Sequence, residues 1–218
     1  MTGEPDGHEE VLVGGNMTAV VRVGDTVRRA AGPWTPTIHA FMRHLRAAGF
    51  EMVPEPLGID DRGREVISFL PGAPATYPPA DFVWSETTLS AVARSLRAFH
   101  DASLGFVPPA NGCWQAYTAY RFVPLTDPAN PDAPFPGADA QARRLAAFCA
   151  AYGEPGIELP DVLASAAAKL RELVAFIERQ AAAGDPAQQA VLARGDVLIY
   201  RRDIAHIERL DPREYALK

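Results

Sequence analysis

The sequence predicts an α+β protein in which a small antiparallel sheet carrying one helix is followed by a helical part. Residues 11–70 consist mostly of short apolar runs separated by turn residues, which is typical of strands. Residues 85–210 instead repeat apolar residues at helical spacing. The pair Pro71-Gly72 separates the two patterns, so the change of structure is expected there.

Three hairpins account for the predicted sheet. Apolar runs flank Gly14-Gly15-Asn16, and a second pair of runs flanks the turn Gly24-Asp25. A third pair flanks Asp60 to Gly63, a stretch rich in turn-forming residues. Because neighbouring hairpins share strands, the order along residues 11–70 is strand, strand, strand, helix, strand, strand. We therefore expect five antiparallel strands.

One helix is predicted within this region, from Thr35 to Ala48. Thr35 is the expected N-cap, Pro36 occupies the first helical position and Gly49 follows the end. Four apolar residues recur at helical spacing, and we expect this stripe to face the sheet: Ile38, Phe41, Met42 and Leu45.

The second part is predicted to be helical. A first helix begins after Ser85 as cap and buries Leu89, Val92, Leu96 and Phe99. Three more helical patterns follow, over residues 139–152, 160–183 and 186–210. The last is predicted to be one helix that continues through Gly195-Asp196. The predicted domain organisation is a flexible N-terminus, a β-rich lobe and a shortened helical lobe, at residues 1–10, 11–72 and 73–218.

Composition excludes several classes of protein. The 218 residues carry a net charge of -6, with a pI of about 5.4, which argues against nucleic acid as a partner. No apolar stretch approaches the roughly 20 residues of a membrane span. Two cysteines are too few for a disulfide framework, and the polar, acidic start differs from a secretory signal. We expect a cytoplasmic protein with no membrane association.

Four stretches of the chain are informative together: GGNMTAVVRVGDTVRRAAGPWTPTIHAFMRHLRAAGF, GREVISFLPG, AYRFVPL and AAGDPAQQAVLARGDVLIYRRDIAHIERL. In these stretches, and in their order, the chain resembles the aminoglycoside phosphotransferase and choline kinase superfamily, in particular its small actinobacterial branch. The resemblance implies a protein-kinase-like, two-lobed fold with a five-stranded N-lobe and a helical C-lobe. It also implies an ATP-dependent phosphotransferase ancestry.

The same resemblance implies a nucleotide site in the N-lobe. Gly14, Gly15 and Asn16 would lie over the phosphates, where absent side chains let backbone N–H groups approach. No lysine precedes Lys169, so Arg28 or Arg29 would replace the usual phosphate-binding lysine. The adenine would contact Ser68, Phe69 and Leu70. Without the resemblance, the glycines form an ordinary tight turn and the arginines a solvated strand end.

An acidic partner for that arginine is not evident from the sequence. The family's helix normally supplies a glutamate, but residues 35–48 contain no acidic side chain. His39 and His44 on this helix are predicted to be surface or partly packed histidines.

The family's catalytic loop has no match. It requires His-x-Asp, an Asn five residues after that Asp and a later metal-binding Asp. None of the five histidines is followed by Asp at the second position, and none of the three asparagines lies five residues after an Asp. The stretch between Asp101 and Ala116 is therefore interpreted as an internal deletion that removed the catalytic loop and metal site. We predict no catalytic residue and no magnesium site, with ATP as the candidate ligand.

Three functions remain open from sequence alone. The chain is a non-catalytic protein that binds a nucleotide or small molecule, an inactivated product with no selected function, or an enzyme with different chemistry. For the last, the polar and aromatic candidates at the junction are His100, Asp101, Cys113, Trp114 and Tyr117. Surface uncovered by the deletion would be covered by Phe106, Val107, Pro108, Pro109 and Trp114, or by a second copy in a homodimer.

Overall fold

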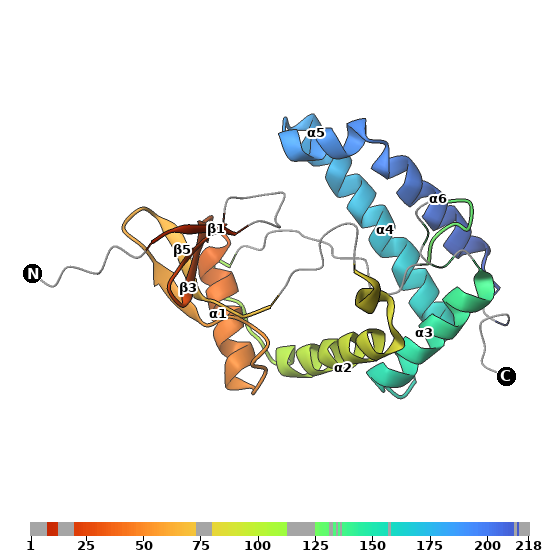
Figure 1. The fold of residues 1–218 in the computed structure, drawn as a ribbon, viewed down its shortest axis with the longest axis horizontal. Coiled ribbons are helices and arrows are strands. Elements are labelled where there is room, and N and C mark those ends of the chain that lie inside the picture. Colours follow the sequence, from red (N-terminus) through yellow and green to blue (C-terminus); the bar gives the residue numbers. More distant parts are fainter. Residues whose placement is uncertain are drawn as a thin grey trace, which may run out of the picture. The chain divides into compact units, whose positions relative to one another are not determined.

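The structure is a computed structural model, and it describes residues 8–12, 20–72, 80–112, 125–130, 133, 135, 137–156, 158–211 and 213. The chain divides into two compact units. The first unit comprises residues 1–78 and 98–116, and the second comprises residues 79–97 and 117–218. Figure 1 shows the elements of both units along the chain and labels most of them.

The first unit contains a five-stranded antiparallel sheet, which confirms the predicted α+β class and sheet. The strands lie in the order β1-β2-β3-β5-β4, so β1 and β4 form the edges. Their bounds are Glu10–Leu12 for β1, Val20–Val23 for β2, Thr26–Ala30 for β3, Pro56–Ile59 for β4 and Arg64–Ser68 for β5.

Two of the three predicted turns lie in described residues, and both are present. Gly24 joins β2 to β3 with φ 58°, a backbone conformation that favours glycine. Gly63 has φ 73° before β5, and Oδ1 of Asp60 accepts hydrogen bonds from the N–H groups of Arg62 and Arg64. The remaining predicted turn, at residues 14–16, lies outside the described residues.

Helix α1, Thr35–Ala47, packs on the sheet through part of the predicted stripe. Met42 is buried with Val27 and Ile67, and Ile38 packs against the same cluster. The predicted N-cap is wrong, because the cap is Trp34 and Thr35 is the first helical residue. The hydroxyl of Thr35 instead accepts a hydrogen bond from the N–H of Gly32 at 2.9 Å, which closes the turn before the helix.

A second face of α1 contacts Leu104 and Phe106 of residues 104–112, here called the covering segment. Val107, which was expected to cover apolar surface, is instead 82% exposed. The expectation that Phe41 faces the sheet cluster is corrected, because its ring packs on Phe99 at 5.8 Å and Phe106 at 4.8 Å. Nε2 of His44 lies 3.1 Å from the carbonyl oxygen of Leu104. Positions 41 and 44 lie on one side of a helix and positions 38, 42 and 45 on another, so the predicted stripe spanned two faces.

The helical part begins with a short 3-10 helix at Asp81–Trp84 and helix α2 at Glu86–Ser103. As predicted, Ser85 caps α2, with its hydroxyl accepting from the N–H of Thr88 at 3.1 Å. The other helices are α3 at Ala138–Tyr152, α4 at Leu159–Ala182, α5 at Pro186–Ala193 and α6 at Asp196–Arg209. The single helix predicted over 186–210 is wrong, because Gly195 with φ 82° separates α5 from α6.

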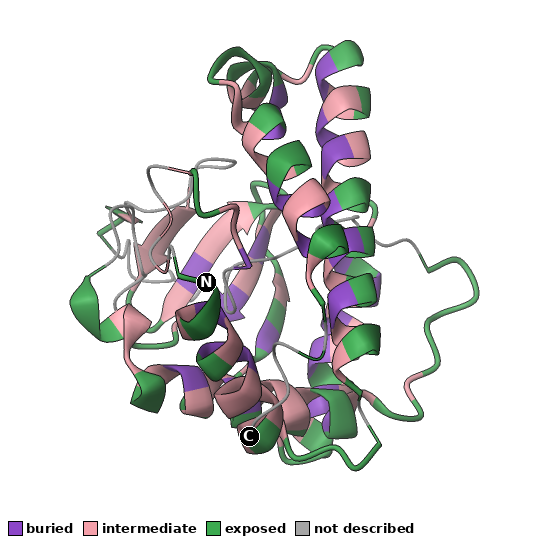
Figure 2. Ribbon diagram, turned by 90° about the vertical axis from the view of Figure 1, so that its right-hand side faces the viewer, coloured by how far each residue is buried: buried purple, intermediate pink, exposed green. Residues whose placement is uncertain are grey.

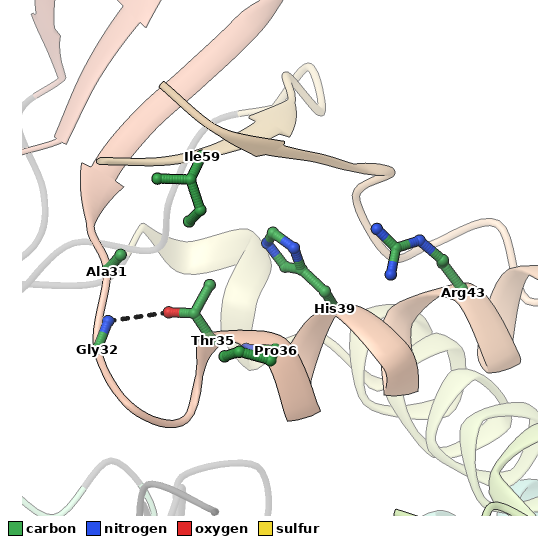
Figure 3. A pocket seen from close by; sticks show the side chains of 7 residues that line it. All are labelled: Ala31, Gly32, Thr35, Pro36, His39, Arg43 and Ile59. Atoms are coloured by element: carbon green, nitrogen blue, oxygen red, sulfur yellow. Dashed lines mark hydrogen bonds between the residues drawn. The ribbon is translucent and has the colours of Figure 1, made fainter. Parts of the chain in front are cut away.

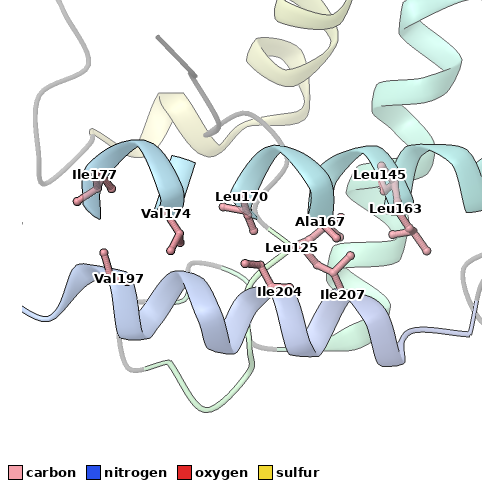
Figure 4. Packing of buried hydrophobic residues seen from close by; sticks show 10 residues of the cluster. All are labelled: Leu125, Leu145, Leu163, Ala167, Leu170, Val174, Ile177, Val197, Ile204 and Ile207. Atoms are coloured by element: carbon pink, nitrogen blue, oxygen red, sulfur yellow. The ribbon is translucent and has the colours of Figure 1, made fainter. Parts of the chain in front are cut away.

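The core of the second unit lies mainly between α4 and α6. Figure 4 shows apolar side chains of the two helices pointing toward one another, with Leu125 and Leu145 from neighbouring segments. Buried positions recur at helical spacing along both helices (Figure 2). The cluster consists of Leu125, Leu145, Leu163, Ala167, Leu170, Val174, Ile177, Val197, Ile204 and Ile207.

A buried carboxyl group adjoins this core. Asp203 of α6 is only 5% exposed, and its Oδ1 accepts a hydrogen bond from the N–H of Asp127 at 2.8 Å. Burial raises the pKa of Asp203 to about 6, and the nearby charge of Asp127 acts in the same direction. Nε2 of His206, one turn further along α6, is buried with no hydrogen-bond partner in the described structure, and burial lowers the pKa of His206.

Among the described residues, no helix combines the length and apolar character that crossing a membrane requires.

The covering segment should contribute to stability through one residue. We expect Phe106→Ala to lower the free energy of unfolding by about 2 kcal/mol, because it removes a ring that packs on Phe41 and His44. Val107→Ala is the matched control, since Val107 is 82% exposed, and it should change stability by less than about 0.5 kcal/mol. Urea denaturation measures the free energy of unfolding of both variants. If Phe106→Ala loses as little stability as Val107→Ala, the covering segment does not support α1.

Asp203 should make stability depend on pH. The pKa of Asp203 is about 6 in the folded chain, against an ordinary aspartate value of 3.8, so the folded state holds the proton of this carboxyl group more tightly. Stability from this group is therefore greatest below pH 3.8 and falls as the pH rises to about 6. Asp203→Asn keeps an acceptor for the N–H of Asp127 without titrating. Over this range wild type should lose about 3 kcal/mol relative to the variant, measured by denaturation at each pH. If the free energy of unfolding changes with pH in the same way in both proteins, the raised pKa of Asp203 is wrong.

Candidate functional site

The two arginines predicted to contact phosphate lie on opposite faces of β3. Val27 is buried against Met42 of α1, and Arg29 is two residues further along the same face. Arg28 lies on the other face, where its Nε is 3.7 Å from Oδ2 of Asp60 and its guanidinium donates to the hydroxyl of Thr26. The α1-facing cation of β3 is therefore Arg29.

Glu65 of β5 holds Arg29 in place. The two residues are direct partners in the strand register, and Nε of Arg29 donates to Oε2 of Glu65. The other carboxylate oxygen, Oε1, lies 3.0 Å from Nε2 of His39 on α1. One carboxylate thus connects β3, β5 and α1, and we call these three residues the Glu65 network.

Burial differs sharply within the Glu65 network. The side chain of Glu65 is 4% exposed and that of His39 is 7% exposed, whereas 37% of the Arg29 side chain is exposed. The expectation that His39 is a surface or partly packed residue is therefore wrong. Because both oxygens of Glu65 receive a donor, the buried charge is compensated. The arrangement fixes a partly exposed guanidinium, a group suited to binding phosphate or carboxylate.

The residues predicted to contact adenine lie at the end of β5, with Ser68 as its last residue and Phe69 and Leu70 after it. The N–H of Ser68 donates to the carbonyl of Glu55 at 2.9 Å, and the N–H of Phe69 donates to that of Asp25 at 2.8 Å. The guanidinium of Arg22 lies 3.9 Å above the ring centre of Phe69. Leu70 is 42% exposed. The backbone N–H groups of Ser68 and Phe69 are thus already hydrogen-bonded within the first unit, whereas the exposed side chain of Leu70 is accessible to a ligand.

Two of the predicted junction residues are described. His100 and Asp101 are exposed at the end of α2, and the His100 ring lies 5.9 Å from that of Phe99. The remaining predicted site residues fall outside the described residues: Gly14, Gly15, Asn16, Cys113, Trp114 and Tyr117. In the part of the chain that the structure describes, no three His, Cys, Asp or Glu side chains form a group that could hold a metal ion.

Sequence analysis missed Glu65 and His39 as site residues. One signal in the sequence indicates that Glu65 is buried. Glu65 and the apolar Ile67 are two residues apart in a strand, so both side chains point to the same face, and the structure shows that this face is buried. An acidic residue on a buried face requires a donor partner. Identifying Arg29 as that partner requires the register between β3 and β5, which no local pattern contains.

The fold resembles that of one solved structure. A choline/ethanolamine kinase family protein from Mesorhizobium loti superposes with a TM-score of 0.52 over 93% of this chain and 92% of its own, at 17% sequence identity. This likeness shows that the chain has the fold of that protein. No protein-family model matches the chain.

A sequence relative has a different named role. The chain is 40% identical over 109 residues to the trifolitoxin immunity protein of Rhizobium leguminosarum bv. trifolii. The matched region covers 49% of this chain and 40% of the immunity protein. The chain therefore spans less than half the length of this relative.

Proposed function

We propose that this chain is a non-catalytic relative of the aminoglycoside phosphotransferase and choline kinase superfamily that binds a nucleotide without transferring its phosphate. The fold shared with a choline/ethanolamine kinase family protein supports the first part of this proposal. The absence of the His-x-Asp and Asn pattern from the sequence supports the second, because phosphoryl transfer in this fold depends on those groups.

The observation that carries the proposal is the position of Arg29. It lies on the α1-facing side of the sheet, where Glu65 orients it and more than a third of its side chain is exposed. A fixed guanidinium can bind a phosphate through two parallel hydrogen bonds. In the proposed complex, Arg29 contacts the phosphates under Gly14, Gly15 and Asn16, and the adenine lies against Leu70.

The protein should bind ATP but not consume it. We expect calorimetric titration to give a dissociation constant that Arg29→Ala raises by about tenfold or more, since a charge-assisted hydrogen bond contributes about 1.5–3 kcal/mol. No γ-phosphate transfer to aminoglycosides or to choline-like alcohols should be detected in the same samples, because the groups that activate the hydroxyl are missing.

Arg62→Ala is the matched control for this prediction. It removes the same charge from an exposed side chain that pairs only at the surface with Glu9, so ATP affinity should stay unchanged. Equal losses in the two variants would indicate a nonspecific charge effect. Turnover at about 1–100 per second, typical of kinases, would overturn the non-catalytic assignment.

Toxin immunity is a second candidate function, favoured by the 40% identity to the trifolitoxin immunity protein. Immunity needs no chemical turnover if the protein protects the cell by binding the toxin or a molecule on which the toxin depends. The chain matches only 40% of that relative's length, so this function requires that the shared region be sufficient for protection.

A growth assay tests the second candidate. A trifolitoxin-sensitive bacterium that expresses this chain should survive toxin concentrations that kill cells carrying an empty vector. Parallel cultures expressing Arg29→Ala and Arg62→Ala would show whether protection uses the Glu65 network. If cells with the wild-type chain die like the vector control while the protein accumulates in folded form, immunity is excluded as its function.

A further inference from the structure

A hollow of about 450 Å³ lies beside α1 in the first unit. Its volume falls in the range of small-molecule sites, about 300–1,000 Å³. Figure 3 shows the side chains around it, from a loop, α1 and the edge strand β4. The lining residues are Ala31, Gly32, Thr35, Pro36, His39, Arg43 and Ile59.

The hollow uses a third face of α1. Pro36, His39 and Arg43 follow one another at intervals of three and four residues, so they share a side of the helix. The sheet-facing cluster contains Met42, and the covering segment packs on Phe41. Pro36 and Arg43 therefore lie away from both packing faces of α1, while His39 connects the hollow to β5 through Glu65.

Arg43 stands apart from the other arginines of the first unit. Within the described residues it makes no ion pair or hydrogen bond, although it is one of seven described arginines in this unit. The other six have acidic or carbonyl partners: Arg22, Arg28, Arg29, Arg46, Arg62 and Arg64. Among the described residues of this unit, Arg43 is thus the one arginine without a partner, and it borders a concave site.

The remaining walls of the hollow are mainly apolar or fixed. Ile59, Pro36 and Ala31 supply aliphatic surface, and Ile59 is 52% exposed at the end of an edge strand. His39 contributes a ring whose orientation is set by the hydrogen bond between its Nε2 and Glu65. A ligand that matches these walls carries a negative group for Arg43 and an apolar body for Ile59.

We infer that this hollow binds a small organic anion, a carboxylate or phosphate group attached to an apolar body. The anionic group is placed at Arg43 and the apolar body against Ile59 and Pro36. This inference does not rest on nucleotide binding, because Arg29 is not among the lining residues of the hollow.

Four probe molecules, tested on the full chain, separate the requirement for an anionic group from the requirement for an apolar body. Benzoate and phenyl phosphate carry both an anion and a ring, benzyl alcohol lacks the charge, and inorganic phosphate lacks the apolar body. Saturation-transfer NMR and calorimetry should show binding of benzoate or phenyl phosphate, with the other two probes weaker by about tenfold or more. Preference between the two organic anions identifies the natural anionic group.

Substitutions then locate the site. Arg43→Gln should weaken binding of the preferred anion by about tenfold while leaving ATP affinity unchanged, whereas Arg29→Ala should do the reverse. Ile59→Asp places a negative charge on the apolar wall and should weaken the same anion, and Arg62→Ala is the neutral control. Circular dichroism confirms that each variant is folded.

Three results would overturn the inference: no binding of either organic anion at millimolar concentration, equal binding of benzyl alcohol, or unchanged affinity in folded Arg43→Gln. Loss of anion binding with ATP binding intact would reject this site without affecting the proposed function. Absence of ATP binding with anion binding intact would reject the proposed nucleotide binding without affecting this site.

Discussion

The first unit depends on one buried carboxylate. Glu65 is almost fully removed from water and lies between a strand cation and a helix histidine. An unpaired charge at this depth is unfavourable, so Glu65 requires the two donors that it has. The network connects β3 to β5 on the side where α1 docks, and Glu65 contacts α1 through His39.

Helix α1 can serve three environments because its 3.6-residue period divides its side chains among different faces. Met42 packs on the sheet, Phe41 meets the covering segment, and Arg43 borders the hollow. Three consecutive residues thus have three different roles. The same helix also carries His39, whose Nε2 lies 3.0 Å from Glu65.

Local chemistry made much of this fold predictable. Gly24 and Gly63 adopt the left-handed conformations that turns require, and short-range patterns also predict the N-cap of α2 and the hairpins β2-β3 and β4-β5. Phe41 was assigned to the wrong face because apolar spacing does not distinguish a sheet from another covering segment. Gly195 was placed inside a helix because apolar residues continue on both sides, although its positive φ separates α5 from α6.

The site was less predictable because its partners come from distant positions. Choosing between Arg28 and Arg29 requires knowing which face of β3 meets α1, and this depends on packing rather than on either residue. Glu65 is separated from Arg29 by 36 residues. Family resemblance placed the expected acidic partner on the helix, whereas this chain has a histidine there and the acid on β5.

A buried ion network rarely adds more stability than apolar residues of similar size, so its retention is better explained by orientation. Here two buried side chains hold one partly exposed guanidinium. Binding an anion requires only that this charge be fixed and accessible, whereas transferring phosphate also requires hydroxyl activation and metal ions. A chain without the transfer motif can therefore keep the binding electrostatics. Immunity by sequestration would likewise require binding without turnover.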